Sequence, residues 1–186
     1  MTEVNLKEGN KDEHVRTLTL DMPAASVTLE GPIIKKKLSY MVSARRSWLD
    51  FFDGLLSEEN RLNHSMYDYN AKLSYSLSSV STLNVLAYGA RDDYRLPIKE
   101  NGENASVLRW DNQVYQLSYT TQKGSLGNTT SVFYSAHNNR AYMGEMGYDG
   151  ESYVHSGIKS LNAATDFSYA YAVSYTHLTL PTILRV

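Results

Sequence analysis

The sequence predicts an all-β protein, an antiparallel up-and-down meander of about eight strands. Apolar and polar residues alternate with a period of two along most of the chain, as Leu73 and Tyr75 do with Lys72 and Ser74. The links between these segments alternate between short and long, as expected for a sheet whose two ends differ. A sandwich with Greek-key connections would not sort its links so regularly.

We expect strands at 14–20, 24–31, 38–48, 64–78, 82–95, 105–122, 129–142 and 157–172. The short links, 31–37, 78–81 and 123–128, are rich in Gly, Pro, Ser, Asn and Lys, which suits tight hairpins. The long links are 49–63, 96–104 and 143–156. Segment 47–60 has the apolar residues for a short helix, but its acidic residues fit a loop equally well.

Composition excludes several classes of function. The 186 residues carry a formal net charge of -2, which argues against nucleic acid as a partner. The chain has no cysteine, which excludes disulfides, zinc–thiolate sites and cysteine nucleophiles. No apolar run approaches the roughly 18 residues that a transmembrane helix needs. A membrane β-strand needs only about 9–11 residues of alternating character, so the sequence is compatible with one.

Tyrosine is unusually frequent, with 15 residues against 4 phenylalanines. Aromatic residues toward the expected strand ends fit the girdles of a membrane barrel, where one end of the ring is apolar and the other is wet. The alternative is cross-strand tyrosine pairing on an ordinary half-buried sheet. The residues concerned are Tyr67, Tyr69, Tyr88, Tyr94, Trp110, Tyr142, Tyr169 and Tyr171.

No pattern in the chain indicates an enzyme or a cofactor site. Asp92 and Asp93 suggest paired acid–base carboxylates, but nothing indicates a pocket around them. Ser156 and Lys159 match S-x-x-K without its partner motifs, and 124–127 fits a hairpin turn. No metal-ligand spacing joins the histidines, which are His14, His64, His137, His155 and His177. Glycosylation sequons begin at Asn63, Asn104 and Asn128, as short polar loops produce by chance.

Four segments resemble TonB-dependent outer-membrane receptors. Segments 4–10 (VNLKEGN), 28–33 (TLEGPI) and 42–50 (VSARRSWLD) resemble the start of the barrel, and 67–75 (YDYNAKLSY) is similar to a following strand. The resemblance covers roughly residues 4–172. It implies that 1–12 is the end of a plug domain, that 13–172 is part of a barrel of about 22 strands, and that the chain is a fragment.

Residues 173–186 have a different expected origin. The run 173–182 (VSYTHLTLPT) resembles the in-frame translation of a sequencing adapter, and index-derived residues follow it. We therefore leave 173–186 out of the predicted fold. A natural strand in this place would be interrupted at Pro181.

The resemblance implies import of a scarce nutrient, of the siderophore, vitamin, glycan or peptide class, across the outer membrane of a Gram-negative cell. The implied partners are TonB through the plug, outer-membrane lipid and lipopolysaccharide, and a small ligand bound by the long links. No cofactor is needed. Two alternatives stay open: a complete eight-stranded outer-membrane barrel, and a soluble all-β binding module.

Arg45 and Arg46 are the charged pair of greatest interest, because alternation sends them to opposite faces of a strand. On a barrel, one would face plug carboxylates or a substrate anion, and the other would face lipopolysaccharide phosphates. The simpler expectation, which we favour, is pairing with carboxylates of the sheet itself. Residues 1–172 alone should form an open, curved sheet with two unpaired edges, which favours aggregation.

Overall fold

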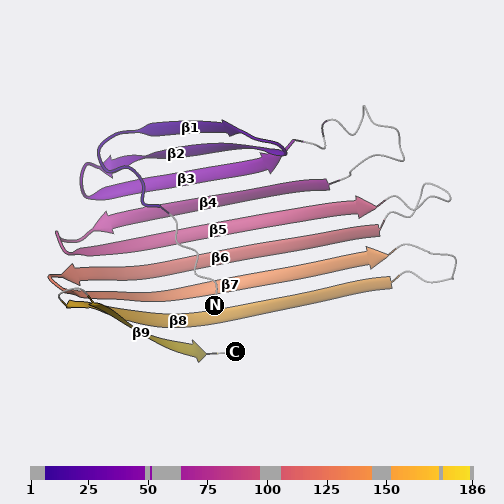
Figure 1. The fold of residues 1–186 in the computed structure, drawn as a ribbon. Coiled ribbons are helices and arrows are strands. Elements are labelled where there is room, and N and C mark those ends of the chain that lie inside the picture. Colours follow the sequence, from indigo (N-terminus) through magenta and orange to yellow (C-terminus); the bar gives the residue numbers. More distant parts are fainter. Residues whose placement is uncertain are drawn as a thin grey trace.

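The computed structural model describes residues 7–48, 51, 64–96, 106–143, 152–171 and 174–184. They form one antiparallel sheet of nine strands in sequential order (Figure 1). The predicted all-β meander is therefore confirmed, and the sheet is open, with β1 and β9 at its edges. The strands are β1 Val15–Leu20, β2 Ala24–Ile34, β3 Leu38–Ser47, β4 His64–Ser76, β5 Ser81–Leu96, β6 Ser106–Lys123, β7 Leu126–Met143, β8 Ser152–Tyr171 and β9 Ser174–Leu184.

The eight expected strands are present, but β7 and β8 begin earlier than the sequence predicted. Gly124 has a positive φ of 58°, whereas the φ of Ser125 is not positive. The two residues therefore form a hairpin turn with glycine at the first central position. Lys123 then pairs with Leu126, and Gly127 and Asn128 continue the ladder. The predicted link 123–128 was too long because Gly127 and Asn128 resemble loop residues.

The β2–β3 and β4–β5 turns lie at the same end of the sheet as this turn, whereas the short β1–β2 connection at 21–23 lies at the opposite end (Figure 1). Between β2 and β3 the amide of Lys37 donates to the carbonyl of Ile34 at 3.0 Å, and Lys36 adopts a left-handed φ of 61°. Between β4 and β5 the amide of Leu77 donates to the carbonyl of Ser81 at 3.0 Å. The long links lie at the opposite end and fall almost entirely outside the described residues, as does the possible helix at 47–60.

The tail left out of the predicted fold forms β9, which pairs antiparallel with β8. Pro181 stands opposite Ala164 within this pairing, so the expectation that it would interrupt a strand was wrong. An edge strand bonds on one side only, and a proline whose nitrogen faces the open side removes no ladder bond. The adapter origin of 173–186 stays a prediction.

Helical structure contributes almost nothing to the described residues. None of their helices is long and apolar enough to cross a membrane. The position of every functional candidate is therefore set by the strand register.

Candidate functional site

The two faces of the sheet have different chemistry. Direct cross-strand partners lie on the same face, so the register assigns the described side chains of the strands to faces. We call the face that carries Leu117 the apolar face, and the face that carries Gln116 the polar face. Along β6 the apolar-face residues Tyr115, Leu117 and Tyr119 are exposed, whereas Gln116 is half-buried.

Large hydrophobic residues on the apolar face are exposed. Leu20 is 74% exposed and Leu117 is 49% exposed. The described strands make a single sheet, so no second layer of described strands covers these side chains. Apart from Tyr153, which lies separately at the long-link end of β8, the exposed members are Leu18, Leu20, Val27, Leu29, Val42, Tyr67, Tyr69, Leu73, Tyr75, Val85, Tyr115, Leu117, Tyr119, Leu126, Val132, Leu161, Phe167 and Tyr169. We call this set the apolar band.

The apolar band runs obliquely across the strands. The cross-strand row that begins at Val27 in β2 passes through Ala44, Tyr69, Gly89, Gln113 and Ala136 to Lys159 in β8. On β2 the band members Val27 and Leu29 are centred at Thr28, one residue from this row. On β8 the band extends from Leu161 to Tyr169, and its middle at Thr165 is six residues from the row in the same direction. The band therefore moves five residues over the six steps from β2 to β8. With a rise of about 3.3 Å per residue and a strand spacing of about 4.8 Å, this corresponds to a strand tilt of about 30°.

Only some of the aromatic residues near the strand ends lie on the apolar face, which an aromatic girdle requires. Tyr67, Tyr69, Tyr142 and Tyr169 lie on the apolar face. Tyr88, Tyr94 and Trp110 share rows with polar-face residues such as Asn70 and Asp92, so they do not belong to an apolar-face girdle. How near a residue lies to the end of a strand does not determine its face, because neighbouring residues along a strand point to opposite faces. The side chain of Tyr171 lies outside the described residues.

Most charged residues on the apolar face lie beyond the band, toward the long links; the exceptions are Arg16, opposite Leu29, and Lys123, opposite Leu126. Arg91 pairs with Asp111, and Arg109 pairs with Asp93, across β5 and β6. We call these two ion pairs the charge ladder. Asp92 and Asp93 point to opposite faces, so the suggested pair of acid–base carboxylates does not form. Ser156 and Lys159 are separated in the same way by the alternation of β8.

Arg45 and Arg46 also separate onto the two faces. On the polar face, Arg45 forms an ion pair at 2.6 Å with Asp68 of the neighbouring strand. This confirms the favoured expectation of pairing within the sheet. On the apolar face, the guanidinium carbon of Arg46 lies 5.5 Å from the centre of the Phe51 ring.

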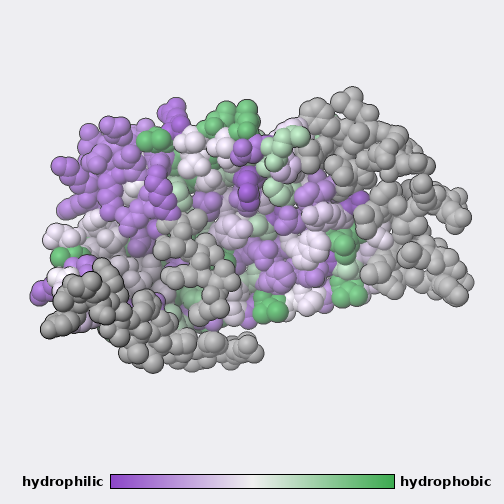
Figure 2. All heavy atoms as spheres, viewed as in Figure 1, coloured by the Kyte–Doolittle hydropathy of each residue, from purple (hydrophilic) through white to green (hydrophobic). Residues whose placement is uncertain are grey.

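The segment 7–13 lies against the polar face of β2–β4, and we call it the strap. Glu30, which is 7% exposed, accepts hydrogen bonds from Lys7 Nζ at 3.1 Å and from the Asn10 amide at 3.2 Å. At Gly9 a β-carbon would fall 2.1 Å from the carbonyl oxygen of Tyr40, so only glycine fits there. Hydrophilic residues gather over the short-turn ends of β1–β4 (Figure 2).

The histidines occupy separate places. His14 Nδ1 lies 3.3 Å from the Tyr40 hydroxyl, and His137 Nδ1 lies 2.7 Å from Asn112 Oδ1 on the polar face. His64 stacks on Tyr94, and His155 lies near Tyr153. The described part of the chain contains no group of three or more His, Asp or Glu residues that could hold a metal ion. The His177 side chain falls outside that part.

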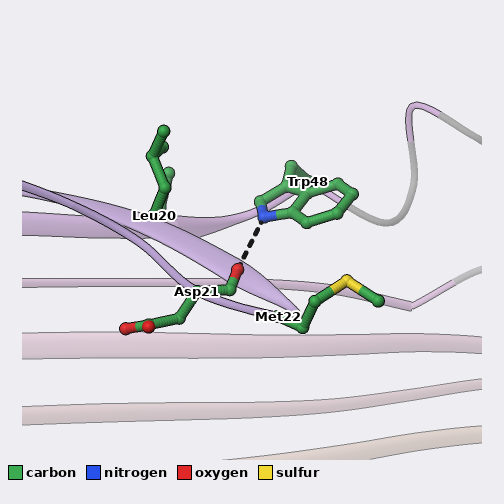
Figure 3. Close-up of a pocket in the computed structure, with 5 residues that line it drawn as sticks. Leu20, Asp21, Met22 and Trp48 are labelled. Atoms are coloured by element: carbon green, nitrogen blue, oxygen red, sulfur yellow. Dashed lines mark hydrogen bonds between the residues drawn. The ribbon is translucent and has the colours of Figure 1, made fainter.

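The sequence did not indicate the hollow beside the β1–β2 connection. Trp48 donates from its indole nitrogen to the carbonyl oxygen of Asp21 at 3.0 Å (Figure 3). Leu20, Met22 and Ala25 complete its mostly apolar lining. Of the glycosylation sequons, Asn128 lies within β7, where its amide donates to Thr165 at 3.0 Å. Asn63 and Asn104 lie outside the described residues.

No protein-family model, curated protein or solved structure matches this chain. The geometry defines a class of fold: an open antiparallel meander with one apolar face and one polar face. The turns of β2–β3, β4–β5 and β6–β7 lie at one end, and the long links and the short β1–β2 connection lie at the other.

Proposed function

We propose that this chain is part of the wall of a TonB-dependent outer-membrane transporter, with the apolar face toward lipid and the polar face toward the lumen. The observation that carries the proposal is the oblique apolar band. Its slope of about 30° is close to the tilt of about 35–45° that strands adopt in outer-membrane barrels. A soluble sheet has no reason to expose an oblique band, because it must cover its apolar face with a second layer.

The connections support the same orientation. Outer-membrane barrels have short periplasmic turns and longer extracellular loops. The turns at 35–37, 77–80 and 124–125 would then be periplasmic, and the charge ladder would lie at the level of the lipid headgroups or above it. Within the described residues β1 pairs only with β2, and β8 pairs with β7 and β9. This arrangement favours a section of a larger barrel over a complete eight-stranded one.

The strap supports a connection to a plug. It lies on the proposed luminal face, held at Glu30, and it leads into β1 from the short-turn end. A plug that filled the lumen would join the first barrel strand from this side. TonB would then act on the plug, and this section of wall would help to enclose the path of a scarce nutrient. Lipopolysaccharide would lie against the outer surface.

Membrane fractionation and site-directed spin labelling test the proposal. Because the chain has no cysteine, each single-cysteine variant of the full-length gene product carries one label once any cysteine in further sequence is replaced by serine. Labels at Tyr115→Cys and Leu117→Cys should collide more with oxygen, which concentrates in lipid. Matched labels at Val114→Cys and Gln116→Cys should collide more with a water-soluble nickel chelate. Recovery in the soluble fraction, or equal collision rates at all four positions, would refute the proposal and favour a soluble binding module.

A further inference from the structure

The polar face carries an aromatic cluster at the long-link end of the sheet. His64 of β4 and Tyr94 of β5 are direct cross-strand partners, and their rings stack with centroids 4.0 Å apart and an interplanar angle of 20°. Trp110 of β6 meets Tyr94 edge-on at 5.4 Å and 81°. Three adjacent strands therefore bring three rings together. Tyr94 is 37% exposed, so the cluster is accessible from the polar side.

Planar hydrogen-bonding side chains lie on both sides of Trp110. Its direct partners are Asp92 on β5 and Asn139 on β7, and the Asp92 side chain is 37% exposed. In the next row, Asn112 holds His137 at 2.7 Å. Carboxylates accept hydrogen bonds, and carboxamides both donate and accept, so these groups can satisfy hydroxyls from either direction. Rings alone would serve an apolar ligand, but rings flanked by such groups suit a ligand with an apolar face and a polar rim.

The charges around the cluster select against anions. Asp92 faces His64 at 3.9 Å, and Arg45 is already paired with Asp68 at 2.6 Å. Among the described polar-face residues of β4–β7, the two rows that hold the rings and the row below contain no arginine or lysine. An anionic ligand would therefore approach carboxylates without a free guanidinium or ammonium group to receive it.

We propose that His64, Tyr94 and Trp110, with Asp92 and Asn139, form a binding site for a neutral saccharide. The rings cover the C–H face of a sugar, and Asp92 and Asn139 bind its hydroxyls. The proposal rests on the transporter function proposed above, and it selects the glycan class among the possible cargoes. Cross-strand stacking also stabilises a sheet, but that role alone requires no bound sugar.

Tryptophan fluorescence provides a direct test, because the chain has only two tryptophans. In the full-length protein, Trp48→Phe leaves Trp110 as the only tryptophan of the present sequence; any tryptophan in further sequence is also replaced by phenylalanine. The probes are maltohexaose, cellohexaose, mannohexaose and xylohexaose, with a ferric catecholate as the anionic comparison. We expect at least one neutral oligosaccharide to change Trp110 emission saturably, and the ferric catecholate to leave it unchanged.

Substitutions at the cluster and on the opposite face separate binding from folding. Trp110→Ala and Asp92→Ala, measured by isothermal titration in protein that keeps Trp48, should each weaken affinity about tenfold or more. Tyr153→Ala removes an apolar-face ring that is 62% exposed at the same end of the sheet, and it should leave the affinity unchanged. Titration also gives the comparison if Trp48→Phe fails to fold.

The outcomes distinguish this proposal from the one on which it rests. No binding of the four neutral oligosaccharides by a protein found in the outer membrane would overturn the saccharide site and leave the transporter standing. Binding that survives Trp110→Ala would also overturn the site, as would a response to the ferric catecholate alone. Saccharide binding by a soluble protein would overturn the transporter and keep the site.

Discussion

Tyr69 places its ring over Gly89, its direct cross-strand partner on the apolar face. A β-carbon at Gly89 would lie 2.5 Å from Cζ of Tyr69 and 2.6 Å from its hydroxyl oxygen. The glycine therefore leaves room for an aromatic ring to lie across the strand, an arrangement that restores the packing that a glycine lacks in a sheet. This pair lies in the cross-strand row from which the slope of the apolar band was measured.

Gly89→Ala should displace the Tyr69 ring and lower the free energy of unfolding by about 1–3 kcal/mol, as overpacking does elsewhere. The measurement is urea unfolding of the full-length protein in detergent micelles. Combining Gly89→Ala with Tyr69→Ala removes the clash, so the double variant should lose less than the sum of the single losses. Strict additivity of the two losses would show that the ring and the glycine do not interact.

Breaking the charge ladder should destabilise the sheet, and reversing it should not. Asp93→Arg alone places like charges at directly opposed positions of β5 and β6 and should cost about 1 kcal/mol. Adding Arg109→Asp restores an ion pair with opposite direction and should recover most of the loss. The readout is the urea midpoint of single and double variants. A double variant no more stable than Asp93→Arg would contradict the role assigned to this pair.

Removing the Glu30 carboxylate should release the strap. Glu30→Ala leaves Lys7 Nζ and the Asn10 amide without the acceptor that holds them. Trypsin should then cleave after Lys7 and Lys11 faster than in the unchanged protein, because proteolysis requires local opening. Asp166→Ala, which removes a polar-face carboxylate from β8, is the matched control. Equal cleavage rates in all three proteins would show that Glu30 does not anchor the strap.

Substitutions in two turns should have opposite effects on stability, because each turn contains a residue with a positive φ. Gly124 has a φ of 58°, which only glycine adopts without strain, so Gly124→Ala should lower stability by about 1 kcal/mol. Lys36 holds a φ of 61° with a side chain, so Lys36→Gly should raise stability or leave it unchanged. Thermal unfolding of both variants provides the comparison. Equal destabilisation by both changes would exclude φ as the cause.

Much of the sheet was predictable because alternation and turn residues are local signals. The period around Leu73 specifies that it shares a face with Tyr75, whatever the neighbouring strand does. Which residues of two neighbouring strands stand opposite each other is a non-local property. For β6 and β7 these partners can be counted from the turn at Gly124, which sets the register of the two strands. The long link between β5 and β6 sets no register, so neither the Arg91–Asp111 pair nor the contact between Tyr94 and Trp110 follows from the sequence.

The candidate site was less predictable than the fold for the same reason. His64, Tyr94 and Trp110 are far apart in sequence and meet only through the pairing of three strands. One signal was available: Tyr94 and Trp110 are large rings near the long-link ends of strands. This signal placed the rings near one end of the sheet but did not indicate on which face they lie. It therefore suggested an aromatic girdle instead of a ligand site.

The oblique band has a consequence for how such sheets grow during evolution. Each strand repeats the pattern of the previous one with an offset of about one residue, and each hairpin begins and ends at the same side. A gene duplication that copies one hairpin therefore inserts two strands whose apolar residues fall on the existing slope. The width of the sheet can change in steps of two strands, while the pattern within each hairpin stays as it was.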